Sequence, residues 1–146
     1  MDYLNAFSIS ATGMKVERLR LDVTAMNIAN ANTTKGANGE LYSPLRVVSR
    51  PTASFVKMMQ NASTGGAELK GTENYSVEKS GLTPKKVHDP AHPQSDNNGF
   101  VEYPNVNPVD EMVNMISATR SYEANIKAFN AAKTMALKAL QIGGDK

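Results

Sequence analysis

The stretch NPVDEMVNMISATRSYEANIKAFNAAKTMALKALQI, residues 107–142, decides the fold of this 146-residue chain, because it holds one proline and no glycine. That proline, Pro108, stands at the first position of a predicted helix, where its missing N–H costs nothing. Asn107 before it is a good N-cap, and two acidic residues follow in the first turn, beside the positive end of the helix dipole. With the glycines at 143–144 as a stop, the stretch predicts a helix from Pro108 to about Gln141, about 51 Å long.

Apolar residues of this predicted helix recur at spacings of three and four on more than one face. The first stripe consists of Met115, Ala118, Tyr122, Asn125, Phe129, Ala132, Ala136 and Ala139. The second stripe consists of Ala124, Ala128, Ala131, Met135, Ala139 and Ile142. A surface helix of a globular domain needs only one such face. The pattern therefore predicts a helix that packs against neighbours on several sides.

A second helix is predicted from about Leu4 to Asn30, where the only helix breaker is Gly13. Its apolar residues form two stripes on roughly opposite sides. They are Phe7, Ala11, Met14, Leu21, Ala25 and Ile28 on one side, and Thr12, Val16, Leu19, Val23 and Met26 on the other. Because glycine costs about 1 kcal/mol in a helix interior, either the helix begins near Gly13 or a neighbour packs closely there. The Asn-rich residues 27–34 predict the helix end, since asparagine tolerates left-handed caps and competes for backbone hydrogen bonds.

The middle of the chain has the opposite composition. All seven prolines lie between residues 44 and 108, and seven of the ten glycines lie between residues 36 and 99. This predicts short strands and turns. Residues 41–48 and 53–59 have strand character, and Pro44 indicates an edge strand. Turns are expected at residues 38–39, 65–66, 80–81 and 98–99, and residues 61–71 are expected to form a loop or hairpin tip.

Together these patterns predict an α+β fold in which two long terminal helices pair as a coiled coil, with a small β-rich domain between them. The expected division is an N-terminal helix at 1–32, a β-rich domain at 33–107 and a C-terminal helix at 108–146.

Composition excludes several functions. The formal net charge is only +2, and acidic and basic residues are balanced in every part of the chain, so we expect no nucleic-acid partner. The absence of cysteine excludes disulfides, thiolate metal sites and a cysteine nucleophile. No run of 18 apolar residues occurs, so we expect no insertion into a lipid bilayer. The N-terminus lacks the basic segment of a secretory signal peptide, so any export is expected to proceed without a cleaved signal.

Candidate catalytic and metal-binding residues are few. His88 and His92 have the spacing of a helical metal pair, but Pro90 between them argues against a helix. Residues 96–99 resemble part of a calcium loop that lacks its bidentate glutamate, so a turn is expected instead. The adjacent acidic residues 110–111 point apart on a helix, and the helix dipole explains them. We therefore expect no enzyme, no cofactor and no metal.

The two helices carry more apolar surface than the middle of the chain can cover, since that part has few large hydrophobic residues. An ordinary two-helix core is the alternative, but both helices are long for the chain and apolar on several faces. We therefore expect assembly through the terminal helices, in a head-to-tail array of copies or relatives. The candidate interface residues are Phe7, Met14, Val16, Leu19, Leu21, Val23, Met26, Ile28, Asn30, Met115, Tyr122, Asn125, Phe129 and Met135.

The sequence also carries a family resemblance. Residues 27–33, NIANANT, are similar to the N-terminal signature of the axial proteins of the bacterial flagellar rod and hook. The run at 99–113, with residues 117–125 and the tail at 133–143, resembles the proximal rod members of that family in particular. The likeness covers residues 1–48 and 83–143.

The resemblance implies a structural subunit of the flagellar basal-body rod, exported by the flagellar type III apparatus and assembled in the periplasm with copies of itself and sibling rod proteins. It implies that the paired helices line the export channel and transmit torque. Asn27, Asn30 and Asn32 would lie where the first helix gives way to the outer domain, and residues 103–108 would form the turn into the last helix. The alternatives are a distal rod or hook subunit, a helical export adaptor and a small enzyme.

Overall fold

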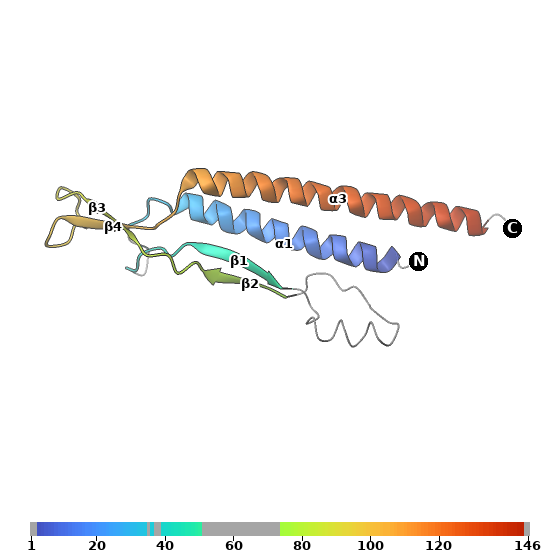
Figure 1. Cartoon of the computed structure of the whole chain (residues 1–146), viewed down its shortest axis with the longest axis horizontal. Helices are drawn as coiled ribbons and strands as arrows, with labels where there is room; N and C mark the ends of the chain where they lie inside the picture. The colour runs from blue at the N-terminus through green and yellow to red at the C-terminus, as the bar shows by residue number, and fades with distance from the viewer. Residues whose placement is uncertain (1–2, 35, 37–38, 51–73, 145–146) are drawn as a thin grey trace. The chain divides into compact units, whose positions relative to one another are not determined.

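A computed structural model describes the chain at residues 3–34, 36, 39–50 and 74–144. Along the chain it contains α1 (Tyr3–Ala29), β1 (Leu45–Arg50), β2 (Asn74–Lys79), β3 (Lys85–His88), β4 (Phe100–Tyr103) and α3 (Pro108–Gly144) (Figure 1). Two long terminal helices with short strands between them confirm the predicted α+β fold class. Within the described ranges, neither helix is both long and apolar enough to cross a membrane.

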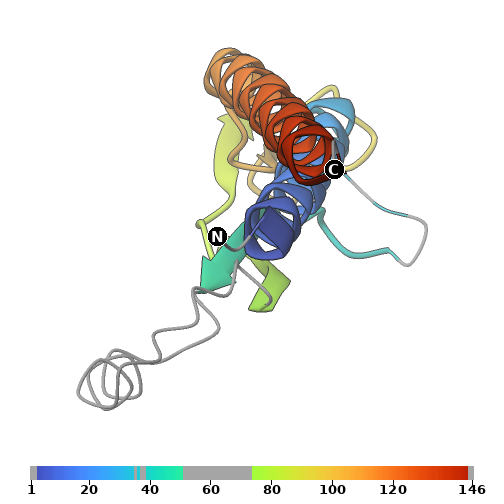
Figure 2. The same ribbon diagram turned by 90° about the vertical axis from the view of Figure 1, so that its right-hand side faces the viewer.

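The chain divides into two compact units, and each unit contains part of α1 and part of α3. The first unit comprises Met1–Leu19, Val48–Ser76 and Ala118–Lys146, and the second comprises Arg20–Val47 and Val77–Ser117. Within each unit the two helical stretches lie side by side, as both ribbon views show (Figures 1 and 2).

In the first unit the two helices run antiparallel. The rings of Phe7 and Phe129 meet edge to face, with centroids 5.0 Å apart and an interplanar angle of 65°. Gly13, six residues after Phe7 in α1, lies against the side chain of Asn125, four residues before Phe129 in α3. The less exposed residues of α3 here are Ser121 and the line Ala118, Tyr122, Asn125, Phe129, Ala132 and Ala136, whereas Ala139 of the predicted stripe is exposed. In that line the spacing alternates between four and three. This alternation is the heptad pattern of a coiled coil, so the inner face of α3 here belongs to the first stripe predicted from the sequence.

The second unit contains a β-hairpin. β3 and β4 pair antiparallel, with Lys85 opposite Tyr103 and His88 opposite Phe100. Lys86 and Glu102 form a cross-strand ion pair at 3.2 Å. Val101 of β4, only 1% exposed, is the largest fully buried side chain among the described residues.

β1 and β2 form the other two-stranded sheet. In the second unit, Arg46 of β1 and Glu78 of β2 form an ion pair at 3.7 Å. The Ser80 N–H donates to the Pro44 carbonyl at 2.7 Å, which closes the end of the sheet.

Two boundaries differ from the sequence-based expectations. β1 begins after Pro44, because proline has no N–H to offer a strand partner. α3 continues through Gly143 to Gly144, because glycine weakens a helix without forbidding it. The expected strand at 53–59, the turn at 65–66 and the loop at 61–71 lie outside the described residues.

The end of α1 is confirmed, but the left-handed cap is wrong, since no described residue other than glycine has a positive φ. The Asn30 side chain instead donates to the Met26 carbonyl at 2.8 Å. This is the competition for backbone hydrogen bonds that the Asn-rich stretch predicts. The expected turns at 80–81 and 98–99 are present, with φ of 65° at Gly81 and 77° at Gly99.

Candidate functional site

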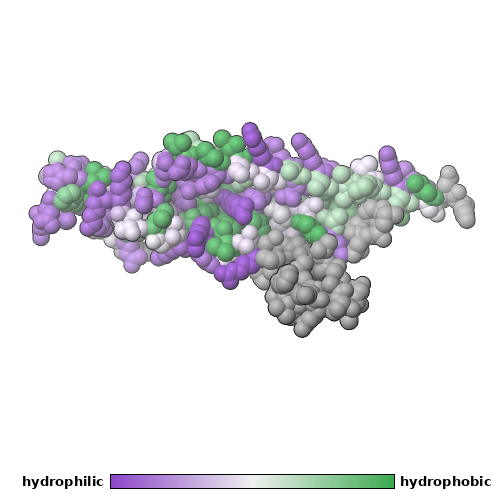
Figure 3. Space-filling view, viewed as in Figure 1, coloured by the Kyte–Doolittle hydropathy of each residue, from purple (hydrophilic) through white to green (hydrophobic). Residues whose placement is uncertain are grey.

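Large apolar side chains remain exposed along α3. In the second unit they occupy its first turns, where Figure 3 shows apolar side chains gathered on the surface. They are Val109 (66% exposed), Met112 (53%), Val113 (60%) and Ile116 (57%). In the first unit they are Met135 (54%), Leu137 (52%), Leu140 (71%) and Ile142 (85%). The first group lies on the opposite side of α3 from its inner face, and Leu140, four residues after Ala136, continues the line of the inner face. The helix therefore carries exposed apolar side chains that α1 does not cover.

The predicted interface residues occupy three kinds of environment. Val16 and Val23 are buried within the chain, each 4% exposed. Met26 and Met135 are exposed, at 44% and 54%. The others are partly buried: Phe7, Met14, Leu19, Leu21, Ile28, Asn30, Met115, Tyr122, Asn125 and Phe129. Their contact with other subunits stays a prediction, but Phe7, Asn125 and Phe129 already form contacts inside the helix pair.

Gly13 allows close approach of the two helices. A Cβ added there would lie 2.9 Å from the Asn125 side-chain amide, closer than real Cβ contacts allow. Asn125 is held in place by a hydrogen bond from its Nδ2 to the Ser121 carbonyl, at 3.0 Å. Of the two explanations that the sequence left open for Gly13, a helix start or a close neighbour, the structure therefore supports the second.

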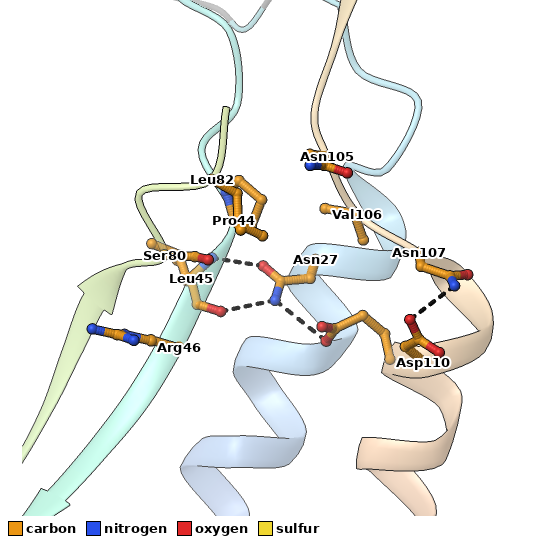
Figure 4. A pocket seen from close by; sticks show the side chains of 11 residues that line it. Asn27, Pro44, Leu45, Arg46, Ser80, Leu82, Asn105, Val106, Asn107 and Asp110 are labelled. Atoms are coloured by element: carbon orange, nitrogen blue, oxygen red, sulfur yellow. Dashed lines mark hydrogen bonds between the residues drawn. The ribbon is translucent and has the colours of Figure 1, made fainter. Parts of the chain in front are cut away.

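Asn27 is the centre of a polar junction in the second unit, formed with Tyr42, Leu45 and Glu111. Figure 4 shows Asn27 and Leu45 of this junction. Its side chain is 2% exposed, and all four hydrogen-bonding positions of its amide are used. Nδ2 donates to the Leu45 carbonyl at 2.9 Å and to Glu111 Oε2 at 3.3 Å. Oδ1 accepts from the Tyr42 hydroxyl at 2.8 Å and from the Leu45 N–H at 2.9 Å.

This junction connects three parts of the fold. Asn27 lies in the last turns of α1, Leu45 begins β1, and Glu111 lies in the first turn of α3. By bonding both the N–H and the carbonyl of Leu45, the Asn27 amide substitutes for a partner strand at that residue. The junction thus sets where the chain leaves the first helix, enters the sheet and meets the last helix.

The junction also perturbs Tyr42. Burial, followed by the negative charge of Glu111, raises the pKa of Tyr42 above its ordinary value of 10.0. Both effects disfavour the phenolate, so Tyr42 stays protonated and continues to donate to Asn27.

The start of α3 is capped as the sequence predicts. Asn107 Oδ1 accepts from the Val109 N–H at 3.1 Å, and the Asn107 carbonyl accepts from the Glu111 N–H at 3.1 Å. Asn107 Nδ2 donates to Asp110 Oδ2 at 2.8 Å. The Asp110 carboxylate therefore fixes the side chain of the capping residue and does not bond to the backbone N–H of that residue. Asp110 and Glu111 both belong to this first turn, but Glu111 also has the role in the Asn27 junction.

The groups considered for metal chemistry have other contacts. The His88 ring packs edge-on against Phe100, with centroids 5.1 Å apart, and His92 lies 6.4 Å from Tyr103. Asp96 Oδ1 accepts from the N–H groups of Phe100 and Asn98, each at 2.8 Å, and these bonds hold the pKa of Asp96 below its ordinary value. In the described part of the chain, no three His, Cys, Asp or Glu side chains are grouped as a metal ion would need.

Sequence reasoning missed two features of this surface. Glu111 was explained by the helix dipole alone, and nothing in the spacing connects it to Asn27, 84 positions away. The exposed residues 109, 112, 113 and 116 do follow a helical spacing, and that signal was available in the sequence.

Comparison with known proteins points to one family. Residues 7–37 match the family described as flagella basal body rod protein, and residues 97–142 match the one described as flagellar basal body rod FlgEFG protein C-terminal. The flagellar basal-body rod protein FlgC of Salmonella typhimurium is 39% identical over 143 residues, covering 98% of this chain and 99% of the relative. FlgC of Bacillus subtilis is 37% identical over 150 residues, with coverage of 98% and 99%, and FlgC of Borreliella burgdorferi is 37% identical over 153 residues, with 97% and 98%.

Proposed function

Because this chain belongs to the FlgC family of flagellar basal-body rod proteins, we propose that it serves as a structural subunit that builds the rod through its terminal helices. Its place is the basal body, assembled with other rod components. The role is mechanical rather than catalytic. The similarity over nearly the full length favours this role over a distal rod subunit, a hook subunit or an export adaptor.

The observation that carries the proposal is the set of exposed apolar side chains of α3 that α1 does not cover. The inner face of α3 already packs against α1, yet residues 135, 137, 140 and 142 remain 52% to 85% exposed. Burying one such side chain contributes about 1.5–3 kcal/mol. Contacts of this kind, repeated along a rod, make it stiff because every subunit would have to lose several of them for the rod to bend.

The finer steps of the proposal rest on the membership in this family. The paired helices of many subunits form a tube that transmits torque and lines an export channel. The chain reaches the periplasm through the flagellar type III apparatus. Copies of the chain and sibling rod proteins are then its neighbours.

A substitution at one of these exposed apolar residues tests the proposal. Leu140→Asp places a charge at a side chain that is 71% exposed and so leaves the fold of the single chain intact. In a strain that depends on this chain, we expect Leu140→Asp to abolish swarming and to remove the protein from purified basal bodies. Gln141→Asp, an equal change of charge at the adjacent exposed residue, is the control and is expected to remain motile.

The decisive measurements are swarm diameter and immunoblots of basal bodies. A Leu140→Asp strain that swarms normally, with the protein present in its basal bodies, would show that this part of α3 is not used in assembly.

A further inference from the structure

An apolar ridge runs along the first turns of α3. We define it as Val109, Met112, Val113 and Ile116, which are between 53% and 66% exposed. Their spacing of three, one and three places them on one side of the helix. Four large side chains exposed to this degree form a patch on the order of 400 Å², a size that often marks an interaction surface.

A second surface of the same unit is concave. It is a hollow of about 510 Å³, lined by Ala31, Asn32, Lys85, Val87, Tyr103, Pro104, Val106 and Pro108. Lys85 and Tyr103 are cross-strand partners in the hairpin, and Val87 lies two residues from Lys85, so these three share one face of the sheet. The wall is thus mixed: apolar side chains such as Val87 and Val106 lie beside the polar groups of Asn32, Lys85 and Tyr103.

The ridge and the hollow are complementary in shape and in charge. The ridge is convex and apolar, and it is flanked by the exposed carboxylate of Asp110. The hollow offers apolar side chains such as Val87 and Val106 and carries the exposed ammonium group of Lys85. A second copy of the chain that inserts its ridge here brings Asp110 toward Lys85, which favours one orientation over others.

We propose that the ridge of one copy docks in the hollow of the next copy, with Met112 as the side chain that enters it. This inference rests on the proposed rod function, since it identifies two surfaces through which the subunits join. In a head-to-tail contact one ridge and one hollow stay free for further copies, whereas a reciprocal pair would use both at once. The proposal commits to the head-to-tail contact.

The size of the contact fits a subunit that joins only within an array. A ridge of about 400 Å², covered by an equal area of the partner in and around the hollow, buries roughly 800 Å² in total, about half of what a stable pair of proteins usually buries. One contact alone is therefore weak. A subunit held at its ridge, at its hollow and at the exposed apolar residues near the end of α3 gains from all of these contacts at once.

Disulfide cross-linking tests this contact directly, because the chain has no cysteine of its own. One set of cells expresses two differently tagged chains, one with Met112→Cys and the other with Val87→Cys. In assembled basal bodies we expect a cross-linked pair that carries both tags. Val87→Cys paired with Met135→Cys is the matched control, since Met135 lies on the same helix and is 54% exposed against 53% for Met112. That pair is expected not to cross-link.

Three further outcomes decide the proposal. A chain carrying both Met112→Cys and Val87→Cys is expected to give a ladder of oligomers, and a product that stops at a dimer would overturn the head-to-tail contact. Adding Lys85→Glu is expected to slow cross-linking by about two- to fivefold, as for an ion pair at the rim of an interface. If Met112→Cys is protected from a maleimide in basal bodies yet never joins Val87→Cys, another protein covers the ridge and the proposal fails.

These results are separable from the rod function. Motile cells whose variant chains assemble without forming the cross-link would overturn the docking and leave the rod role intact. Cells that lack the chain altogether and still build complete rods would overturn the rod role itself.

Discussion

Replacing Asn27 by alanine tests whether the junction at the end of α1 organises the second unit. The substitution removes all four hydrogen bonds of a side chain that is 2% exposed. It leaves the N–H and carbonyl of Leu45, the hydroxyl of Tyr42 and the carboxylate of Glu111 without this partner. A buried polar group left unpaired costs about 1–3 kcal/mol.

Some of these groups are only partly buried, and water reaches them once the amide is gone. We therefore expect Asn27→Ala to lower the free energy of unfolding by about 3 kcal/mol, well below the sum of four full penalties. That is a large share of the stability of a typical domain, about 5–15 kcal/mol. With a urea m-value of about 1.5 kcal/mol/M, the midpoint of unfolding falls by about 2 M.

The assay is urea unfolding of the full chain, followed by circular dichroism of the helices. Asn30→Ala is the matched control, because it removes the same amide from a residue just beyond the end of the same helix. Asn30 Nδ2 makes an exposed bond to the Met26 carbonyl, so we expect its loss to cost about 1 kcal/mol or less. If Asn27→Ala costs no more than Asn30→Ala, the junction does not organise the fold and the reasoning is wrong.

Two further predictions concern the helix pair and Tyr42. Gly13→Ala should gain about 1 kcal/mol of stability from helix propensity and lose it again through the contact of the new Cβ with Asn125 at 2.9 Å. In an Asn125→Ala background the full gain should appear in thermal unfolding. Equal effects of Gly13→Ala in both backgrounds would contradict the close approach. Glu111→Gln should lower the pKa of Tyr42, measured by phenolate absorbance, because it removes a negative charge while burial keeps its larger effect. Since the pKa of Tyr42 is raised on folding, its stabilising contribution is present below pH ~10 and is lost as the pH rises through the folded-state pKa. The free energy of unfolding should therefore fall less steeply with rising alkaline pH in Glu111→Gln than in the original chain.

The helices could be predicted because their signals are local. Pro108, its cap at Asn107 and the glycines at the far end all act within a turn of the helix boundary. The two apolar stripes of α3 were likewise visible, since their residues repeat at spacings of three and four. The family signatures at both ends are also runs of consecutive residues.

The strands were harder to locate. β2, β3 and β4 have between four and six residues each, and β3 is exposed along its whole length. An exposed strand shows no alternation of apolar and polar residues, so its sequence carries little sign of its pairing. Pairing is decided by partners such as Lys86 and Glu102, which are distant in the sequence.

The sequence alone determined that this chain has two terminal helices with several apolar faces, a middle divided by proline and glycine, and the features of a flagellar axial protein. Only the tertiary structure decided which face of α3 is covered and which is left for other molecules. It also decided that Asn27, rather than Asn30, holds α1, β1 and α3 together. Hydrogen bonds such as that from Asn27 to Glu111 join residues 84 positions apart, and no local pattern encodes a contact that exists only once the chain has folded back on itself.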